Sequence, residues 1–348
     1  MQRVYLDHNA TTPLRPEARA AMLAAMDVLG NPSSVHAEGR AAKALMERAR
    51  AQVAAAFGAD GADIVFTSGA TEAAALGLAG GGFHCAGIEH DAVRANCRET
   101  LAVDAGGQVS VTGAPGSVAV QLANSETGVV QNLPEGIGLV DATQGFGKLP
   151  VAFNWMGCER AIVSAHKLGG PKGVGALVLR RGTEVPAAIR GGGQEMGRRA
   201  GTENLIGMAG FGAAAEAAAR DLADGTWERV EKLRNILENA LADPANETIF
   251  VGNSGKRLPN TSCIVTPGWK GETQVMQMDL AGFAISAGSA CSSGKVKASA
   301  VLQAMGFDER AAASAIRVSL GPETTEDEIS RFAEAWTRAR DKHRARAA

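Results

Sequence analysis

The chain has 348 residues, of which 45% are hydrophobic and 21% charged, and its formal net charge is -2. This length predicts one large domain plus a smaller one, because a single hydrophobic core usually stops growing at roughly 250–300 residues. The balanced charge excludes a global attraction to nucleic acid or acidic membranes, and no apolar run approaches the roughly 20 residues of a membrane helix. The N-terminus lacks the features of a secretion signal, so the sequence predicts a cytoplasmic protein.

Five cysteines are spread along the chain without a close pair or a metal-ligand spacing: Cys85, Cys97, Cys158, Cys263 and Cys291. An odd, separated set is typical of reduced thiols, so neither a disulfide framework nor a metal site is expected. Most of these thiols are expected to be small core residues.

Between about residues 15 and 245, Ala-rich amphipathic stretches alternate with short apolar runs, which predicts an α/β layered domain. A surface helix is predicted over residues 40–57, because the apolar side chains form a single stripe. Strands are predicted at 63–67, 83–88, 118–122, 138–141, 161–164 and 175–179. Several of these runs are continuously apolar, which is typical of strands buried on both faces. A helix over 226–241 ends before Asp243 and Pro244, where we place a domain boundary.

After this boundary the pattern changes to strands at 261–266, 283–286 and 315–320 and helices at 272–280 and 299–305. A terminal helix begins with Thr325 and Glu328, which have capping-box spacing. We therefore expect a large α/β domain over residues 14–245. A smaller α+β domain is expected over residues 246–348 together with residues 1–13, whose strand-like start precedes the first helix.

Two segments end apolar runs with residues that suit a ligand. The Thr-Ser-Gly-Ala-Thr-Glu segment at 67–72 leads from a strand through glycine into a helix, and a helix N-terminus favours phosphate. The Val-Asp-Ala-Thr-Gln segment at 140–144 places Asp141 at the carboxyl end of a strand, where open α/β sheets bind ligands. Taken alone, the first is more often a capped helix and the second a turn, so the structural interpretation leads for both.

A third segment, at 163–173, favours a functional interpretation. An apolar strand leads through Ser164, His166 and Lys167 into a loop rich in glycine and proline. A lysine at the edge of a core is costly unless it is neutral, paired or covalently bound. A lysine that attacks an aldehyde as the neutral amine meets this condition. A surface lysine would not call for histidine beside it and glycines behind it.

Together the three segments supply what pyridoxal 5'-phosphate requires: a phosphate site, a carboxylate that keeps the pyridine nitrogen protonated, and a lysine for covalent attachment. No other cofactor motif fits. The chain lacks the G-x-x-x-x-G-K-[ST] pattern, and its run of glycines at 80–82 does not match a dinucleotide fingerprint.

A fourth segment, at 285–294, is a loop rich in serine and glycine around Cys291. A thiol in a polar, glycine-bounded loop is accessible, in contrast to Cys263 inside an apolar strand. On this segment alone, a catalytic thiol and a chance loop cysteine are equally good interpretations.

With these motifs in place, the chain resembles the cysteine desulfurases, pyridoxal-phosphate enzymes of fold type I in the class V aminotransferase group. The resemblance extends from the Tyr-Leu-Asp-His-Asn-Ala-Thr-Thr-Pro segment at 5–13 to Ala-Ile-Arg-Val-Ser-Leu-Gly at 315–321. The Ser-Ala-Gly-Ser-Ala-Cys loop is similar to that of the first, NifS/IscS-like group. The implied fold is a large domain with a mostly parallel seven-stranded sheet and helices on both faces, plus a smaller α+β domain.

The resemblance also implies a role for each matching residue. The expected catalytic residues are Lys167, Cys291 and His90, which stacks on the cofactor ring and transfers protons. Asp141 is expected to pair with the pyridine nitrogen and Gln144 to bond the ring oxygen. The full set of expected cofactor contacts is Ala70, Thr71, His90, Asn124, Ser125, Asp141, Gln144, Ser164, His166, Lys167 and Thr202.

Substrate and partner contacts follow from the same resemblance. Arg317 and Asn9 are expected to bind the substrate, and the guanidinium fork of Arg317 suits a carboxylate. Thr202 is expected to reach the phosphate of a second subunit, which implies a homodimer with shared sites. No nucleic acid or membrane partner is expected.

The implied reaction removes sulfur from L-cysteine. The Lys167 amine takes the α-proton, the Cys291 thiolate attacks the substrate sulfur and becomes a persulfide, and L-alanine is released. A sulfur-acceptor protein, such as one serving iron–sulfur cluster assembly, then takes the sulfur. We expect the 288–294 loop to be poorly ordered without substrate, because sulfur transfer demands reach.

The chain departs from the family pattern in three places. Ser125 stands where a second asparagine is usual after Asn124, the segments 71–124 and 125–141 are shorter, and the residues after the loop include Lys295 and Lys297 instead of an acidic-proline signature. Two alternatives therefore stay open. One is a pyridoxal-phosphate lyase or aminotransferase acting on selenocysteine or another amino acid, and the other is a non-catalytic scaffold homologue.

Overall fold

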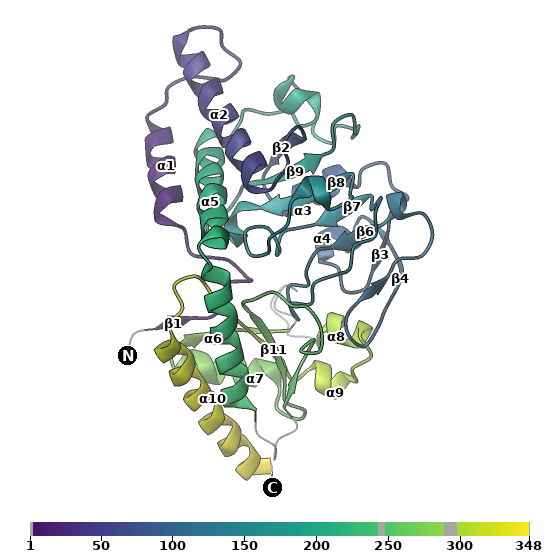
Figure 1. The fold of residues 1–348 in the computed structure, drawn as a ribbon, viewed down its shortest axis with the longest axis vertical. Helices are drawn as coiled ribbons and strands as arrows, with labels where there is room; N and C mark the ends of the chain where they lie inside the picture. Colours follow the sequence, from purple (N-terminus) through teal and green to yellow (C-terminus); the bar gives the residue numbers. More distant parts are fainter. Residues whose placement is uncertain (1–2, 243–247, 289–297, 348) are drawn as a thin grey trace.

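The computed structural model describes residues 3–242, 248–288 and 298–347 (Figure 1). Cys291 and most of its loop therefore lie outside the described residues. The prediction that this loop is poorly ordered without substrate concerns these same residues. Among the helices that the structure describes, none combines the length and the apolar character that crossing a bilayer requires.

A mostly parallel β-sheet lies at the centre of the larger part of the molecule. Its first five strands stand in the order β2-β9-β8-β7-β6. An isolated parallel bridge between His84 and Val118 continues the sheet into the order β3-β4-β5. Seven strands thus run from β2 to β4, and among them only β9 is antiparallel to its neighbours. The mostly parallel seven-stranded sheet is confirmed, and β5 adds a short antiparallel edge.

The strand limits show which signals the sequence carried. The strands are β2 (Asp63–Thr67), β3 (His84–Ala86), β4 (Arg98–Val103), β5 (Val109–Ser110), β6 (Ala119–Gln121), β7 (Leu139–Asp141), β8 (Arg160–Ser164) and β9 (Gly175–Leu179). Six of these were predicted within two residues at each end. Strands β4 and β5 were not predicted, because β4 is largely exposed and has no continuous apolar run.

Three long helices pack together on one side of this sheet, at the upper left of Figure 1: α1 (Pro16–Met26), α2 (Ala37–Ala56) and α5 (Leu205–Ala223). Helix α2 buries Ala42, Met46, Ala49 and Val53, which recur every three or four residues and form the predicted apolar stripe. Close approach needs small residues, since a side chain at Gly212 of α5 would lie 2.9 Å from the Ala49 Cα. The short helices α3 (Ala70–Gly77) and α4 (Asp91–Arg94) follow β2 and β3.

The smaller part of the molecule is built on an antiparallel sheet in the order β10-β11-β14-β13. Its strands are β10 (Ile249–Phe250), β11 (Thr261–Val265), β14 (Ala315–Ser319) and β13 (Ser286–Ala287). The N-terminal strand β1 (Val4–Tyr5) pairs in parallel with β12 (Phe283–Ala284). The helices of this part are α7 (Gly271–Leu280), α8 (Ala300–Ala304), α9 (Glu309–Ala312) and α10 (Glu326–Ala347). Helix α6 (Thr226–Leu241), which the sequence predicts in the large domain, packs against α10.

Apolar packing links these elements across the chain. One buried cluster joins Leu6 next to β1, Leu237 of α6, Ile264 of β11 and Trp336 of α10. The predicted capping box of α10 is confirmed: Thr325 N donates to Glu328 Oε2 at 2.9 Å, and Glu328 N donates to Thr325 Oγ1 at 3.3 Å. The limits of the two domains remain a prediction.

Short 3₁₀ helices complete the description at Pro115–Ser117, Phe153–Trp155, Ala165–Lys167 and Gln194–Gly197. The third of these, η3, follows directly on β8 and carries Lys167.

Candidate active site

A cavity of about 520 Å³ opens at the carboxyl ends of the parallel strands. Gln121, Asp141 and Ser164 end β6, β7 and β8, and all three line it. Neighbouring parallel strands end at the same edge of a sheet, which explains why residues distant in sequence meet there. The predicted site residues in the wall are Asn9, Ala70, Thr71, His90, Ser125, Asp141, Gln144, Ser164, His166, Lys167 and Arg317.

Lys167 is placed at the cavity by the turn from β8 into η3. Its Nζ donates to the main-chain oxygens of Asn9, at 2.6 Å, and Ala10, at 3.0 Å. The amine therefore lies between the strand ends of the large sheet and the N-terminal segment. It is partly buried, as an amine that must both avoid solvation and meet a ligand should be.

One end of the cavity is suited to a phosphate. Ala70 and Thr71 open helix α3 after Gly69, so their N–H groups lie at the positive end of the helix. The turn stays open because β9 begins with glycine: a side chain at Gly175 would lie 2.8 Å from the Gly69 backbone. Lys172 in the wall adds a cation that the sequence reasoning had not assigned.

His166 lies in the same wall with its Nδ1 3.2 Å from Thr11 Oγ1. Burial, followed by the charges of Lys167, Lys172 and Lys148, lowers the pKa of His166 to about 4. The imidazole is therefore neutral near pH 7 and acts as a hydrogen-bonding group rather than as a cation.

Asp141 lines the cavity at the end of β7, and its Oδ1 accepts a hydrogen bond from Thr143 N at 2.9 Å. It is thus both the turn former and the cavity carboxylate that the sequence left as alternatives. Glu89 lies buried nearby, and burial raises its pKa well above the usual range, with the charge of Asp141 adding to this. Burial therefore disfavours the charged form of the Glu89 carboxyl group.

His90 begins helix α4, and its Nδ1 accepts a hydrogen bond from Ala92 N at 3.1 Å. In the neutral ring the proton therefore resides on Nε2. His90 is exposed and lines the cavity, so it can contact both a ligand and solvent.

Arg317 reaches the cavity from β14 of the smaller part. Its Nη2 pairs with Asp7 Oδ1 at 2.7 Å, and its Nη1 donates to the main-chain oxygen of Ser125 at 3.0 Å. Its Nε is buried without a hydrogen-bond partner among the described residues. Thr143 Oγ1 is likewise buried and has no hydrogen-bond partner among the described residues.

Comparison with known proteins identifies the family of this chain. The sequence profile described as Aminotransferase class-V matches residues 4–332. A cysteine desulfurase from Cereibacter sphaeroides is 38% identical over 96% of this chain and 95% of the relative. One from Frankia sp. (strain EuIK1) is 40% identical over 97% of this chain and 91% of the relative. The chain belongs to the cysteine desulfurases of the aminotransferase class-V family. A NifS-like protein from Rickettsia africae ESF-5 has the same fold, with a TM-score of 0.88 at 32% identity over 98% of this chain and 100% of that structure.

Three residues carried over from the desulfurase family do not line the cavity as described. Asn124 is buried behind it: its Nδ2 donates to Ile88 O at 3.1 Å, and its Oδ1 accepts from Thr127 N at 2.8 Å. Asn124 therefore shapes the loop that presents Ser125. Thr202 is exposed and outside the lining, and Cys291 lies outside the described residues.

One polar residue next to the cavity was missed by the sequence reasoning. Lys148 is buried, 3% exposed, and its Nζ donates to Gln144 Oε1 at 2.8 Å. The signal was present, since this lysine stands four residues after Gln144 and just before Leu149 in an otherwise apolar turn.

The wall fits pyridoxal phosphate. The helix N-terminus, Ser164 and Lys172 suit the phosphate, Asp141 suits the ring nitrogen, and Lys167 suits the aldehyde.

Proposed function

We propose that the chain is a pyridoxal-phosphate-dependent cysteine desulfurase that removes sulfur from L-cysteine and releases L-alanine. The observation that carries this proposal is the meeting of Lys167, Asp141 and the α3 N-terminus in one cavity. When bound, pyridoxal phosphate supplies the electron sink that makes the α-proton of an amino acid acidic. Family membership through relatives named cysteine desulfurase supports the choice of substrate.

The residues of the chain divide the remaining work. Asp141 keeps the ring nitrogen protonated, and Gln144 donates to the ring oxygen with the N–H that does not face Asn9. The Lys167 amine, which lies in the cavity wall, would take the α-proton of the substrate. Arg317, which lines the cavity, would hold the substrate carboxylate through its guanidinium group.

The sulfur step belongs to Cys291. Its thiolate would attack the substrate sulfur, and the carbon–sulfur bond would break with its electrons staying on the carbon. That carbon takes a proton to become the methyl group of L-alanine, and a Cys291 persulfide remains. A sulfur-acceptor protein then receives the outer sulfur. We further propose a cytoplasmic homodimer in which Thr202 completes the neighbouring subunit's phosphate site, in keeping with its exposed position.

A Cys291→Ser variant tests the reaction. Wild-type protein given L-cysteine and a reductant is expected to form alanine and sulfide in equal amounts, whereas Cys291→Ser loses both but keeps the visible absorbance of the bound cofactor. The matched control is Cys97→Ser, a half-buried thiol outside the cavity lining, which should retain activity. Alanine and sulfide from Cys291→Ser at the wild-type rate would show that Cys291 is not the sulfur acceptor. Wild-type protein that binds the cofactor but forms neither product from L-cysteine would favour a lyase or aminotransferase acting on selenocysteine or another amino acid.

Spectroscopy alone distinguishes the proposed enzyme from a non-catalytic scaffold homologue. A catalytic member of the family should show the visible absorbance of lysine-bound cofactor near neutral pH after addition of pyridoxal phosphate. Protein that binds no pyridoxal phosphate would instead support a non-catalytic homologue.

A further inference from the structure

Lys148 is buried without a carboxylate partner among the described residues, an arrangement that proteins rarely retain without a use. It lies in the loop after β7 and is 3% exposed. Its Nζ donates to two amide oxygens, Gln144 Oε1 at 2.8 Å and Asn9 Oδ1 at 3.3 Å. Burial of a lysine is costly, and amide oxygens offset less of that cost than a carboxylate would.

Both hydrogen-bond partners of Lys148, the side chains of Gln144 and Asn9, lie next to the main-chain oxygen of Asn9. That oxygen accepts from Lys167 Nζ at 2.6 Å and from Gln144 Nε2 at 2.9 Å. Lys148 thus contacts both side chains, Asn9 and Gln144, whose groups surround the acceptor of the Lys167 amine.

The orientation of the Gln144 amide depends on Lys148. Its NH₂ group must face the Asn9 carbonyl oxygen, because two oxygens would repel there. Its oxygen then faces Lys148, which supplies the donor. Without that donor the Gln144 oxygen would be buried and unsatisfied, and rotation of the amide would break its bond to Asn9.

The Asn9 side chain is held from several sides. Its Oδ1 accepts from Asn260 Nδ2 at 3.1 Å as well as from Lys148, and its Nδ2 donates to Thr261 Oγ1 at 2.8 Å. Asn9 is therefore a rigid junction between the N-terminal segment, the β7 loop and β11. Of its neighbours, Lys148 is the one that also holds Gln144.

We propose that Lys148 is a positioning residue that fixes Gln144 and Asn9 so that Lys167 Nζ is held where it can attach covalently to the cofactor aldehyde. This inference rests on the proposed function, because it assumes that pyridoxal phosphate occupies the cavity. Attachment joins Lys167 Nζ to the aldehyde carbon, whose oxygen leaves as water. Lys148 contributes no atom to that reaction.

The charge state of Lys148 is compatible with this role. Burial first, and then the charges of Lys167 and Arg317, lower the pKa of Lys148 well below its usual range. A neutral amine still has two N–H groups, which match its two amide acceptors. Lys148 therefore positions its neighbours in either protonation state.

The test compares two probes in the full-length chain freed of cofactor. Pyridoxal phosphate can attach to Lys167, whereas pyridoxamine phosphate fills the same contacts but cannot. In Lys148→Met, a substitution that keeps the length of the chain, the Kd for pyridoxal phosphate is expected to rise about 10-fold more than the Kd for pyridoxamine phosphate. The matched control is Lys43→Met on the exposed face of α2, which should change neither Kd.

Each outcome decides the matter. Equal losses for both probes, or no loss, would overturn the positioning role and leave Lys148 as a packing residue. If Lys148→Met does not fold, Lys148→Gln, which keeps an N–H donor, is measured in the same way and must show the same selective loss in smaller degree. A wild-type chain that binds neither probe would instead refute the proposed function, so the two failures are distinguishable.

Discussion

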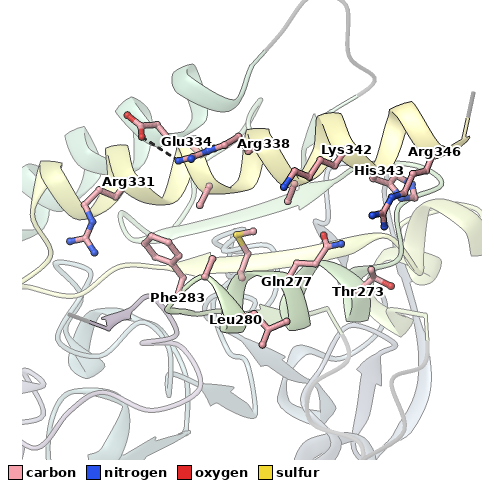
Figure 2. A pocket seen from close by; sticks show the side chains of 14 residues that line it. Thr273, Gln277, Leu280, Phe283, Arg331, Glu334, Arg338, Lys342, His343 and Arg346 are labelled. Atoms are coloured by element: carbon pink, nitrogen blue, oxygen red, sulfur yellow. Dashed lines mark hydrogen bonds and ion pairs between the residues drawn. The ribbon is translucent and has the colours of Figure 1, made fainter. Parts of the chain in front are cut away.

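Two of the hollows among the described residues are similar in size and opposite in character. The candidate active site measures about 520 Å³ and draws its wall from strand ends, helix starts and the N-terminal segment. The second is a groove of about 650 Å³ between α7 and α10. Figure 2 shows Arg331, Glu334, Arg338, Lys342 and Arg346 spread along α10 above Gln277 and Leu280 of α7.

The difference lies in how the charged groups are held. Arg338 of the groove pairs with Glu334 at 3.7 Å, and the two side chains are 74% and 72% exposed. Arg317 of the site pairs with Asp7 at 2.7 Å, and its side chain is only 6% exposed. Solvation weakens the first pair, whereas burial strengthens the second. The larger hollow is therefore the poorer candidate for chemistry, because convergence and desolvation matter more than volume.

Replacing a lysine in each hollow should give the largest contrast. Lys167→Ala removes the amine that attaches the cofactor and takes the α-proton, so alanine formation is expected to fall about 10³-fold or more. Lys342→Ala in the groove should leave the rate unchanged, since its ammonium is exposed. Rates of alanine formation at saturating cysteine measure both, and comparable losses in the two variants would break the comparison.

An arginine-to-lysine substitution in each hollow should give a smaller difference in activity than the lysine substitutions. Arg317→Lys keeps the charge but loses the planar fork, so kcat/KM for cysteine is expected to fall about 10- to 100-fold, mainly through KM. Arg338→Lys should have no effect. A fall in kcat at unchanged KM for Arg317→Lys would contradict a role in binding the substrate carboxylate.

The pH dependence of stability gives the smallest contrast. Burial raises the pKa of Glu126 from 4.5 to about 7, although Ser299 Oγ donates to it at 2.5 Å. Since the pKa of Glu126 is higher in the folded than in the unfolded chain, its protonated carboxyl group stabilises the folded chain. This stabilisation is fully present below pH 4.5 and is lost as pH rises through about 7. Wild-type protein should therefore lose about 3 kcal/mol of unfolding free energy between pH 4 and pH 8 through this carboxyl group, and Glu126→Gln should remove that loss.

Urea unfolding at the two pH values measures this difference. Glu334→Gln in the groove is the control, because it makes the same change to a side chain that is 72% exposed. An equal pH slope in wild type and Glu126→Gln would show that this carboxyl group does not titrate differently in the folded chain.

Local signals in the sequence were enough for much of the fold. The continuous apolar runs of β2 and β9 and the stripe of α2 predicted these elements because their periodicity is set by burial on one or both faces. Strand β4 was not predicted, because its exposed residues, such as Arg98 and Glu99, form no apolar pattern. Its pairing with β3 depends on a neighbour and not on its own composition.

The sequence by itself determined that Lys167, Asp141 and the 67–72 turn follow strands, and parallel strands necessarily bring such ends to one edge. Only the tertiary structure decided that Asn124 turns away from the cavity while Lys148 is buried beside it. The placement of Asn124 depends on Ile88 and that of Lys148 on Asn9, and both partners belong to distant segments. Hydrogen bonds between such segments exist only after the chain has packed, and no local pattern encodes them.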